Sequence, residues 1–61
     1  MLDMIKIAVD AMGGDNSPKK IIDGIIHNHQ SNNNSFYKIF GYENKISEII
    51  KGKIDNDYYE I

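Results

Sequence analysis

The chain has 61 residues, no cysteine, and a formal net charge of −2 from seven basic and nine acidic side chains. Without thiols it has neither disulfides nor the cysteine ligands of most structural zinc sites, and its balanced charge gives no general attraction to DNA or RNA. No apolar stretch approaches the roughly 20 residues that span a bilayer, and Asp3 and Lys6 interrupt the apolar start that a signal peptide needs. We therefore expect a soluble, cytoplasmic protein.

The first predicted element is a strand over residues 4–9, MIKIAV, which is mostly apolar and β-branched. A nearly continuous apolar run of this length is typical of a strand buried on both faces of a parallel sheet. Ser17 and Pro18 then indicate a helix start, because serine caps helices and proline is suited to the first helical position. Four isoleucines follow at helical spacing and form one apolar stripe: Ile21, Ile22, Ile25 and Ile26.

The polar run SNNNS at residues 31–35 ends this helix, and residues 36–40, FYKIF, predict a second strand. A second helix begins at Glu43 and stops at Gly52, with three isoleucines on one face, Ile46, Ile49 and Ile50. The last four residues, YYEI, resemble the start of a third strand. The order β-α-β-α-β predicts an α/β fold with a parallel sheet and right-handed crossovers. Three strands and two helices cannot cover both faces of such a sheet, so we expect residues 1–61 to be the N-terminal part of a single larger α/β domain.

Residues 10–17, DAMGGDNS, connect the first strand to the first helix, which is the favoured ligand position in doubly wound sheets. Gly13 and Gly14 permit positive φ and a close approach of the backbone to a bound group. The N–H groups at the start of the following helix complete a general anion site. We therefore predict that Gly13, Gly14, Asn16 and Lys19 bind phosphate.

Lys19 and Lys20 support this prediction because they lie in the first helical turn. A lysine there opposes the helix dipole by about 0.3–1 kcal/mol, and a bound phosphate would turn that repulsion into attraction. The alternative is that both lysines are solvated surface residues. Asp10 and Asp15 would repel a phosphate unless each holds a neighbouring donor, accepts a proton or faces away. Asp10, at the end of the strand, is the better candidate for chemistry, although both aspartates also suit turns and caps.

Several named motifs are missing from the sequence. Neither Gly-x-Gly-x-x-Gly nor the Gly-Lys-Ser/Thr ending of the nucleotide-triphosphate loop occurs. His27 and His29 lie two residues apart on the predicted helix and therefore point in different directions, so they cannot share a metal ion. We predict no metal site.

The stretch IKIAVDAMGGDNSPKKIIDG, residues 5–24, resembles the N-terminus of the bacterial phosphate acyltransferases of phospholipid synthesis. Its core, DAMGGD at residues 10–15, is highly specific. The segment FYKIFGYENKISEIIKG, residues 36–52, is similar to the second strand and helix of that family. Phe40-Gly41-Tyr42 stands where the family tends to have Val-Gly-Asp, and Ser17 stands where alanine is common.

This resemblance implies an enzyme that converts acyl-acyl carrier protein and inorganic phosphate into acyl phosphate, without a cofactor. It implies a three-layer α/β/α fold related to the isocitrate and isopropylmalate dehydrogenases, of which this chain holds the incomplete β-α-β-α-β start. It also implies a dimer in the cytoplasm or loosely on the membrane. Asp10 or Asp15 would orient the phosphate or accept its proton, and we name both as catalytic candidates.

We expect the 61 residues alone not to catalyse acyl transfer, because too much of the sheet is missing to close a site. The alternative function is a small phosphate- or nucleotide-binding α/β module without acyl transfer. An aspartate-nucleophile phosphatase is disfavoured, because such enzymes have a second aspartate where this chain has Met12.

Overall fold

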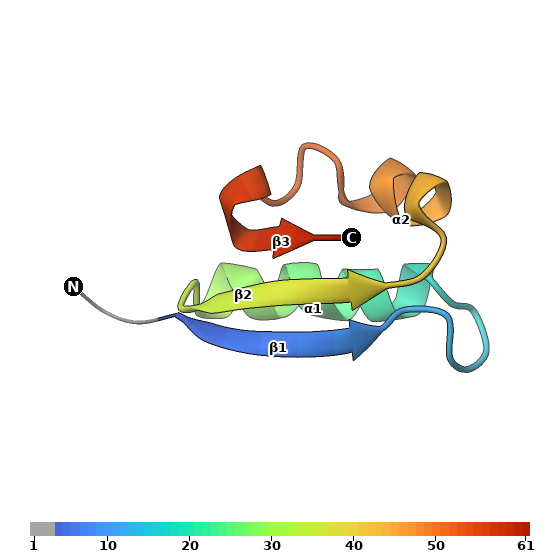
Figure 1. The fold of residues 1–61 in the computed structure, drawn as a ribbon, viewed down its shortest axis with the longest axis horizontal. Coiled ribbons are helices and arrows are strands. Elements are labelled where there is room, and N and C mark those ends of the chain that lie inside the picture. Colours follow the sequence, from blue (N-terminus) through green and yellow to red (C-terminus); the bar gives the residue numbers. More distant parts are fainter. Residues whose placement is uncertain (1–3) are drawn as a thin grey trace.

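The computed structural model describes residues 4–61. Its elements, in chain order, are β1 (Ile5–Asp10), α1 (Lys19–Ser31), β2 (Ser35–Phe40), α2 (Glu43–Ile50), the short 3-10 helix η1 (Asn56–Tyr58) and β3 (Tyr59–Glu60), as shown in Figure 1. The three strands form one parallel sheet in the order β1-β2-β3. The predicted β-α-β-α-β order and parallel sheet are therefore confirmed.

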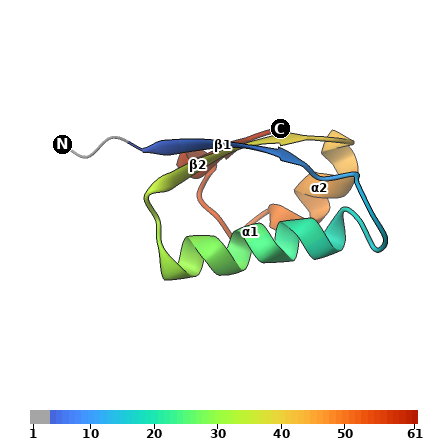
Figure 2. The same cartoon turned by 90° about the horizontal axis from the view of Figure 1, so that it is seen from below.

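Both helices cover the same face of the sheet, as Figure 2 shows. This follows from the strand order, because two right-handed crossovers that step in the same direction place their helices on the same side. Within residues 4–61 no helix covers the second face, so the described structure is a two-layer part of an α/β fold. None of its helices has the length and apolar character needed to cross a membrane.

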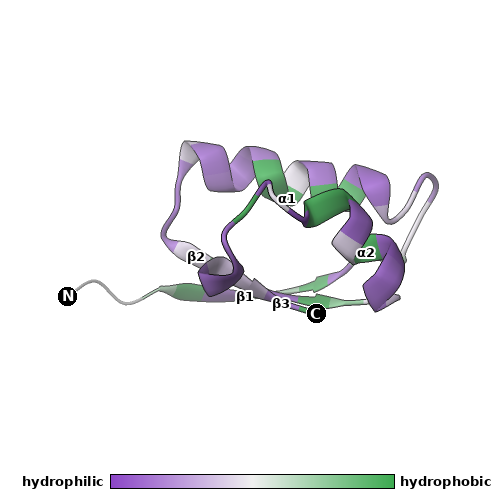
Figure 3. Cartoon of the chain, turned by 90° about the horizontal axis from the view of Figure 1, so that it is seen from above, coloured by the Kyte–Doolittle hydropathy of each residue, from purple (hydrophilic) through white to green (hydrophobic). Residues whose placement is uncertain are grey.

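The core lies between the helices and the sheet. Figure 3 shows apolar segments in green on α1, α2 and the strands, separated by largely hydrophilic turns. The buried side chains come from every layer: Ala11, Ile22, Ile25, Ile26, Tyr37, Ile39, Ile46, Ile50 and Ile54. The apolar stripe predicted for the first helix thus provides its sheet-facing side, and isoleucine dominates the core because it supplies volume without polar atoms.

The prediction that the first strand is buried on both faces is wrong. β1 is an edge strand, in which Ile7 and Val9 are half-buried on the helix side while Lys6 and Ala8 are exposed on the other. Burial on the second face needs a second covering layer, which residues 4–61 do not supply. The uncovered face, here called the open face, has a depression of about 260 Å³, with Lys6, Ala8, Phe36, Lys38 and Glu60 in its lining.

Two contacts near the end of α1 hold the helix against the rest of the molecule. The Asn28 side-chain amide donates a hydrogen bond of 2.6 Å to the hydroxyl of the buried Tyr37 on β2. His29 packs against Tyr58 of η1 with ring centroids 4.7 Å apart. These contacts secure the end of the helix opposite to the loop in which the candidate site lies.

Candidate functional site

The candidate site begins at Asp10, the last residue of β1. The Oδ1 atom of Asp10 accepts a hydrogen bond of 3.0 Å from the Met12 N–H. Aspartate side chains commonly form this kind of turn with the backbone N–H two residues further on. Between them, Ala11 is fully buried, and its N–H donates to the Phe40 carbonyl at 2.9 Å. The Asp10 carboxylate therefore has a defined orientation at the carboxyl end of the sheet.

The two glycines have different structural roles. Gly14 has φ of 91°, a left-handed conformation that side chains other than glycine rarely adopt. Gly13 has no positive φ, and a Cβ on it would lie 3.6 Å from Asp10 Oδ2, at ordinary contact distance. Gly14 is thus required by the backbone, whereas Gly13 brings a bare backbone next to the Asp10 carboxylate.

The expectation that Ser17 caps the helix is wrong. The Ser17 hydroxyl donates a hydrogen bond of 2.6 Å to the Gly13 carbonyl, and Pro18 occupies the N-cap position without any side-chain cap. Ser17 closes the loop because Asn16, with φ of 65°, reverses the chain and brings the hydroxyl back to Gly13. Asparagine is one of the few residues with side chains that tolerate this conformation.

The start of α1 leaves backbone donors available. The Lys20 N–H donates to the Asn16 carbonyl at 3.1 Å, and the Ile22 N–H donates to the Pro18 carbonyl at 2.9 Å. Within the described part of the chain, the N–H groups of Lys19 and Ile21 donate no hydrogen bond to a backbone carbonyl of the preceding loop. Uncapped donors at the positive end of a helix dipole attract anions.

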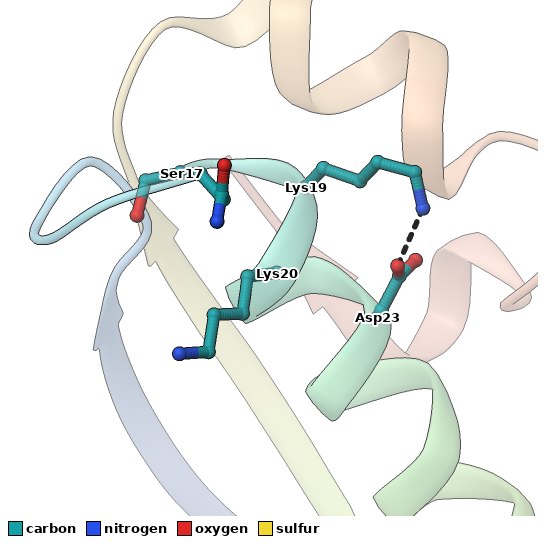
Figure 4. A pocket seen from close by; sticks show the side chains of 5 residues that line it. Ser17, Lys19, Lys20 and Asp23 are labelled. Carbon is teal, nitrogen blue, oxygen red and sulfur yellow. Dashed lines mark hydrogen bonds and ion pairs between the residues drawn. The ribbon is translucent and has the colours of Figure 1, made fainter.

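The two lysines of the first turn extend in different directions, as Figure 4 shows. Lys19 Nζ lies 2.6 Å from Asp23 Oδ2, and the two side chains are 73% and 45% exposed. Asp23 therefore already compensates the charge of Lys19 without a bound anion. An exposed pair of this kind contributes only about 0.3–0.5 kcal/mol, so an anion can compete with Asp23 for Lys19. Lys20 has no ion pair with any other residue in the range 4–61.

An open depression of about 520 Å³ lies at this helix start, with Asn16, Ser17, Lys19, Lys20 and Asp23 in its lining (Figure 4). The predicted site residues thus fall into two groups. Asp10 and Gly13 lie together at the end of β1, and Asn16 and Lys19 lie together at the start of α1. The hydrogen bond from Ser17 to Gly13 links the groups, with Gly14 and Asp15 on the exposed turn between them.

Two residues of this arrangement do not follow from the sequence reasoning. Asp23 is four positions after Lys19, and this spacing is a known signal for side-chain pairing on a helix. The Ser17 contact has no comparable signal, because it depends on how the loop folds back. Among residues 4–61, no cluster of three or more histidine, aspartate or glutamate side chains is placed to hold a metal ion.

Neither a family model nor a solved structure matches the chain. Curated relatives do match it. A phosphate acyltransferase of Pelagibacter ubique is 68% identical over 50 residues, which cover 82% of this chain and 15% of the relative.

More distant relatives carry the same name. A phosphate acyltransferase of Lactobacillus johnsonii is 41% identical over 56 residues, covering 85% of this chain and 17% of the relative. One of a Nitratiruptor species is 43% identical over 53 residues, covering 87% of this chain and 16% of the relative. The chain thus spans about one sixth of the length of these relatives. The resemblance inferred from DAMGGD is confirmed, and the chain is a homologue of the phosphate acyltransferases.

Proposed function

We propose that this chain supplies the phosphate-binding loop of an enzyme that transfers a fatty acyl group from acyl-acyl carrier protein to inorganic phosphate. The product, an acyl phosphate, would serve phospholipid synthesis. The observation that carries the proposal is the uncapped start of α1, where the N–H groups of Lys19 and Ile21 remain available beside Lys20. The names of the relatives support the same reaction class.

The reaction needs phosphate to be held as a nucleophile against a thioester. A phosphate oxygen attacks the carbonyl carbon, the carbonyl oxygen becomes an oxyanion, and the carbon–sulfur bond then breaks. The acyl phosphate and the carrier thiol are the products, and the proton carried by the phosphate passes to the departing sulfur. Fixed donors and a fixed geometry lower the barrier of such a step.

Asp10 is the carboxylate best placed to orient the phosphate or to carry its proton. Its Oδ1 atom is held by the Met12 N–H, and its Oδ2 atom lies on the Gly13 side of the loop. Asp15 is exposed on the turn and makes no hydrogen bond through its side chain to the rest of residues 4–61. In the proposal Asp10 therefore has the catalytic role, and Asp15 is the second candidate.

The proposed reaction needs more than these residues. The 61-residue chain alone would be inactive, because the open face of its sheet and its short β3 leave the site without surrounding walls. The proposal includes a homodimer of the longer protein, located in the cytoplasm or loosely on the membrane.

Phosphate binding is tested on the chain itself. Amide resonances of isotope-labelled protein are followed by NMR while inorganic phosphate replaces chloride at constant ionic strength. We expect shifts at Gly13, Gly14 and Lys19, and weaker binding for Lys20→Ala. Lys53→Ala is the matched control, because Lys53 is an exposed lysine outside the loop and α1. Equal phosphate affinity of the Lys20→Ala and Lys53→Ala variants would exclude Lys20 from the site.

Catalysis is tested in a chimera that carries the 50 matched residues of this chain in the Pelagibacter ubique relative. Acyl phosphate formed from acyl-acyl carrier protein and phosphate is trapped with hydroxylamine. We expect an active chimera, a loss of about 10²- to 10⁴-fold for Asp10→Asn, as for a general acid–base group, and no activity for Gly14→Val. Parental rates for both variants would contradict the proposed roles.

The size of the depression favours a second candidate function. A volume of about 520 Å³ is within the usual range for small organic ligands and leaves space beyond a phosphate ion. A nucleotide-binding module without acyl transfer would show tighter binding of nucleotides than of phosphate at the same amides. If this alternative holds, the chimera with the Pelagibacter ubique relative would form no acyl phosphate.

A further inference from the structure

The loop between β2 and α2 lies directly against the candidate site. β1 and β2 pair in register, with Asp10 opposite Phe40, so their carboxyl ends finish at the same level. One further hydrogen bond, from the Ala11 N–H to the Phe40 carbonyl at 2.9 Å, holds the beginnings of the two loops together. The residue after Phe40 is Gly41, which therefore faces the first loop.

Gly41 is the glycine of this chain with the least space around it. A Cβ on Gly41 would lie 2.7 Å from Ile46 Cδ1, 2.8 Å from Met12 Cγ and 3.1 Å from Met12 Sδ. Cβ atoms essentially never approach other heavy atoms within 3.0 Å, so any side chain at this position must displace a neighbour. Ile46 is fully buried in the core, whereas Met12 is half-buried and has the more flexible side chain. Met12 is thus the neighbour that moves most easily.

Displacement of Met12 would change the orientation of the Asp10 side chain, because one hydrogen bond connects the two residues. The Met12 N–H is the donor that holds Asp10 Oδ1 at 3.0 Å, and Asp10 makes no other side-chain hydrogen bond with residues 4–61. We propose that Gly41 is a positioning residue of the candidate site: it leaves room for the Met12 side chain, and Met12 in turn fixes the orientation of the Asp10 carboxylate. This inference rests on the proposed function for its catalytic consequence, but the packing itself is measurable without activity.

The test compares Gly41→Ala with two double variants that relieve different clashes. Met12→Ala added to Gly41→Ala removes the Cγ and Sδ atoms of Met12. Ile46→Val added to Gly41→Ala removes the Ile46 Cδ1 atom and relieves only the core. Gly41 has φ of 159°, so all three variants have the same backbone strain and differ only in the clashes. If Gly41 acts through Met12, the first pair recovers the site, whereas the second pair relieves only the core.

The first readout uses the 61-residue chain. The amide of residue 12 is followed by NMR for its chemical shift and for its protection from hydrogen exchange, and urea unfolding gives the stability of each variant. We expect Gly41→Ala to lose the protection of this amide, Met12→Ala to restore it in the double variant, and Ile46→Val not to restore it. Unchanged protection in Gly41→Ala would overturn the inference.

The second readout uses the chimera with the Pelagibacter ubique relative. We expect Gly41→Ala to lower kcat by about 10- to 100-fold, since a misplacement of about 1 Å can have an effect of this size. The KM for phosphate should change by less than about twofold, because the donors of α1 are unaffected. Recovery of kcat by Ile46→Val instead of Met12→Ala would show that Gly41 serves the core alone. An inactive parental chimera would refute the proposed function, while the amide measurement would still decide the role of Gly41.

Discussion

Gly14 and Gly24 both face open space, yet replacement by alanine should change the stability of the chain in opposite directions at these two positions. A Cβ on Gly14 or on Gly24 would meet no heavy atom within 4 Å. Gly24 is an exposed residue in the interior of α1, whereas Gly14 lies in the loop with φ of 91°. Because neither alanine would make or break a contact, the backbone conformation alone decides the sign.

The magnitudes follow from the two conformations. Glycine in a helix interior is about 0.8–1.0 kcal/mol less favourable than alanine, so Gly24→Ala should raise the free energy of unfolding by about 1 kcal/mol. An L-residue in a left-handed conformation costs about 1–2 kcal/mol. Alanine regains about 0.4–1 kcal/mol by restricting the unfolded chain. Gly14→Ala should therefore lower the free energy of unfolding by about 1 kcal/mol.

Urea unfolding followed by far-UV circular dichroism measures both changes. With a denaturant dependence of about 1 kcal/mol per molar for a chain of this size, the midpoints should move by about 1 M, upward for Gly24→Ala and downward for Gly14→Ala. A shift of both midpoints in the same direction would refute the assignment of these effects to φ.

Three further predictions concern the site and the core. Asp23→Asn should lower the phosphate Kd about 2- to 5-fold in the NMR titration, since it releases Lys19 and removes a carboxylate from the depression; an unchanged Kd would argue against a role for Lys19. Tyr37→Phe should lower the free energy of unfolding by about 1 kcal/mol through loss of the Asn28 hydrogen bond, and equal urea midpoints would show that this bond contributes nothing. Ile22→Ala should cost about 2–5 kcal/mol, because Ile22 is fully buried. This is comparable to the whole stability of a small domain, so a cooperative urea transition close to that of the parent chain would contradict the assigned core.

The elements of this fold could be predicted because their signals are local. The isoleucine spacing of α1 and α2 depends on neighbours within two turns, and Gly52 ends α2 with φ of 79°, as a glycine after a helix commonly does. Burial of β1 depends instead on what covers the sheet. The same residues, Ile5 to Asp10, would be buried on both faces beneath a second helical layer, and the strand pattern alone does not reveal that layer.

The candidate site was predictable as a loop but not as an arrangement of side chains. The glycines, the aspartates and the lysines between the first strand and the first helix indicated an anion site from their chemistry alone. The Ser17 hydroxyl donates to the Gly13 carbonyl instead of accepting a hydrogen bond from a helix N–H group, because Asn16 turns the chain back. The contact of Met12 with Gly41 joins two loops that are distant in sequence, and only the parallel pairing of β1 with β2 brings them together.

The parallel pairing also links ligand concentration to folding. Because β1 and β2 run in the same direction, no tight hairpin can join them, and their loops meet only after α1 has closed the crossover. The donors of the candidate site are therefore assembled in the folded chain and dispersed in the unfolded one. An anion that binds them would stabilise the folded state by mass action, by about 2.7 kcal/mol at a concentration of 100 Kd. At the proposed site, phosphate would thus act on this chain as a folding ligand, and the population of folded chains would rise with the phosphate concentration.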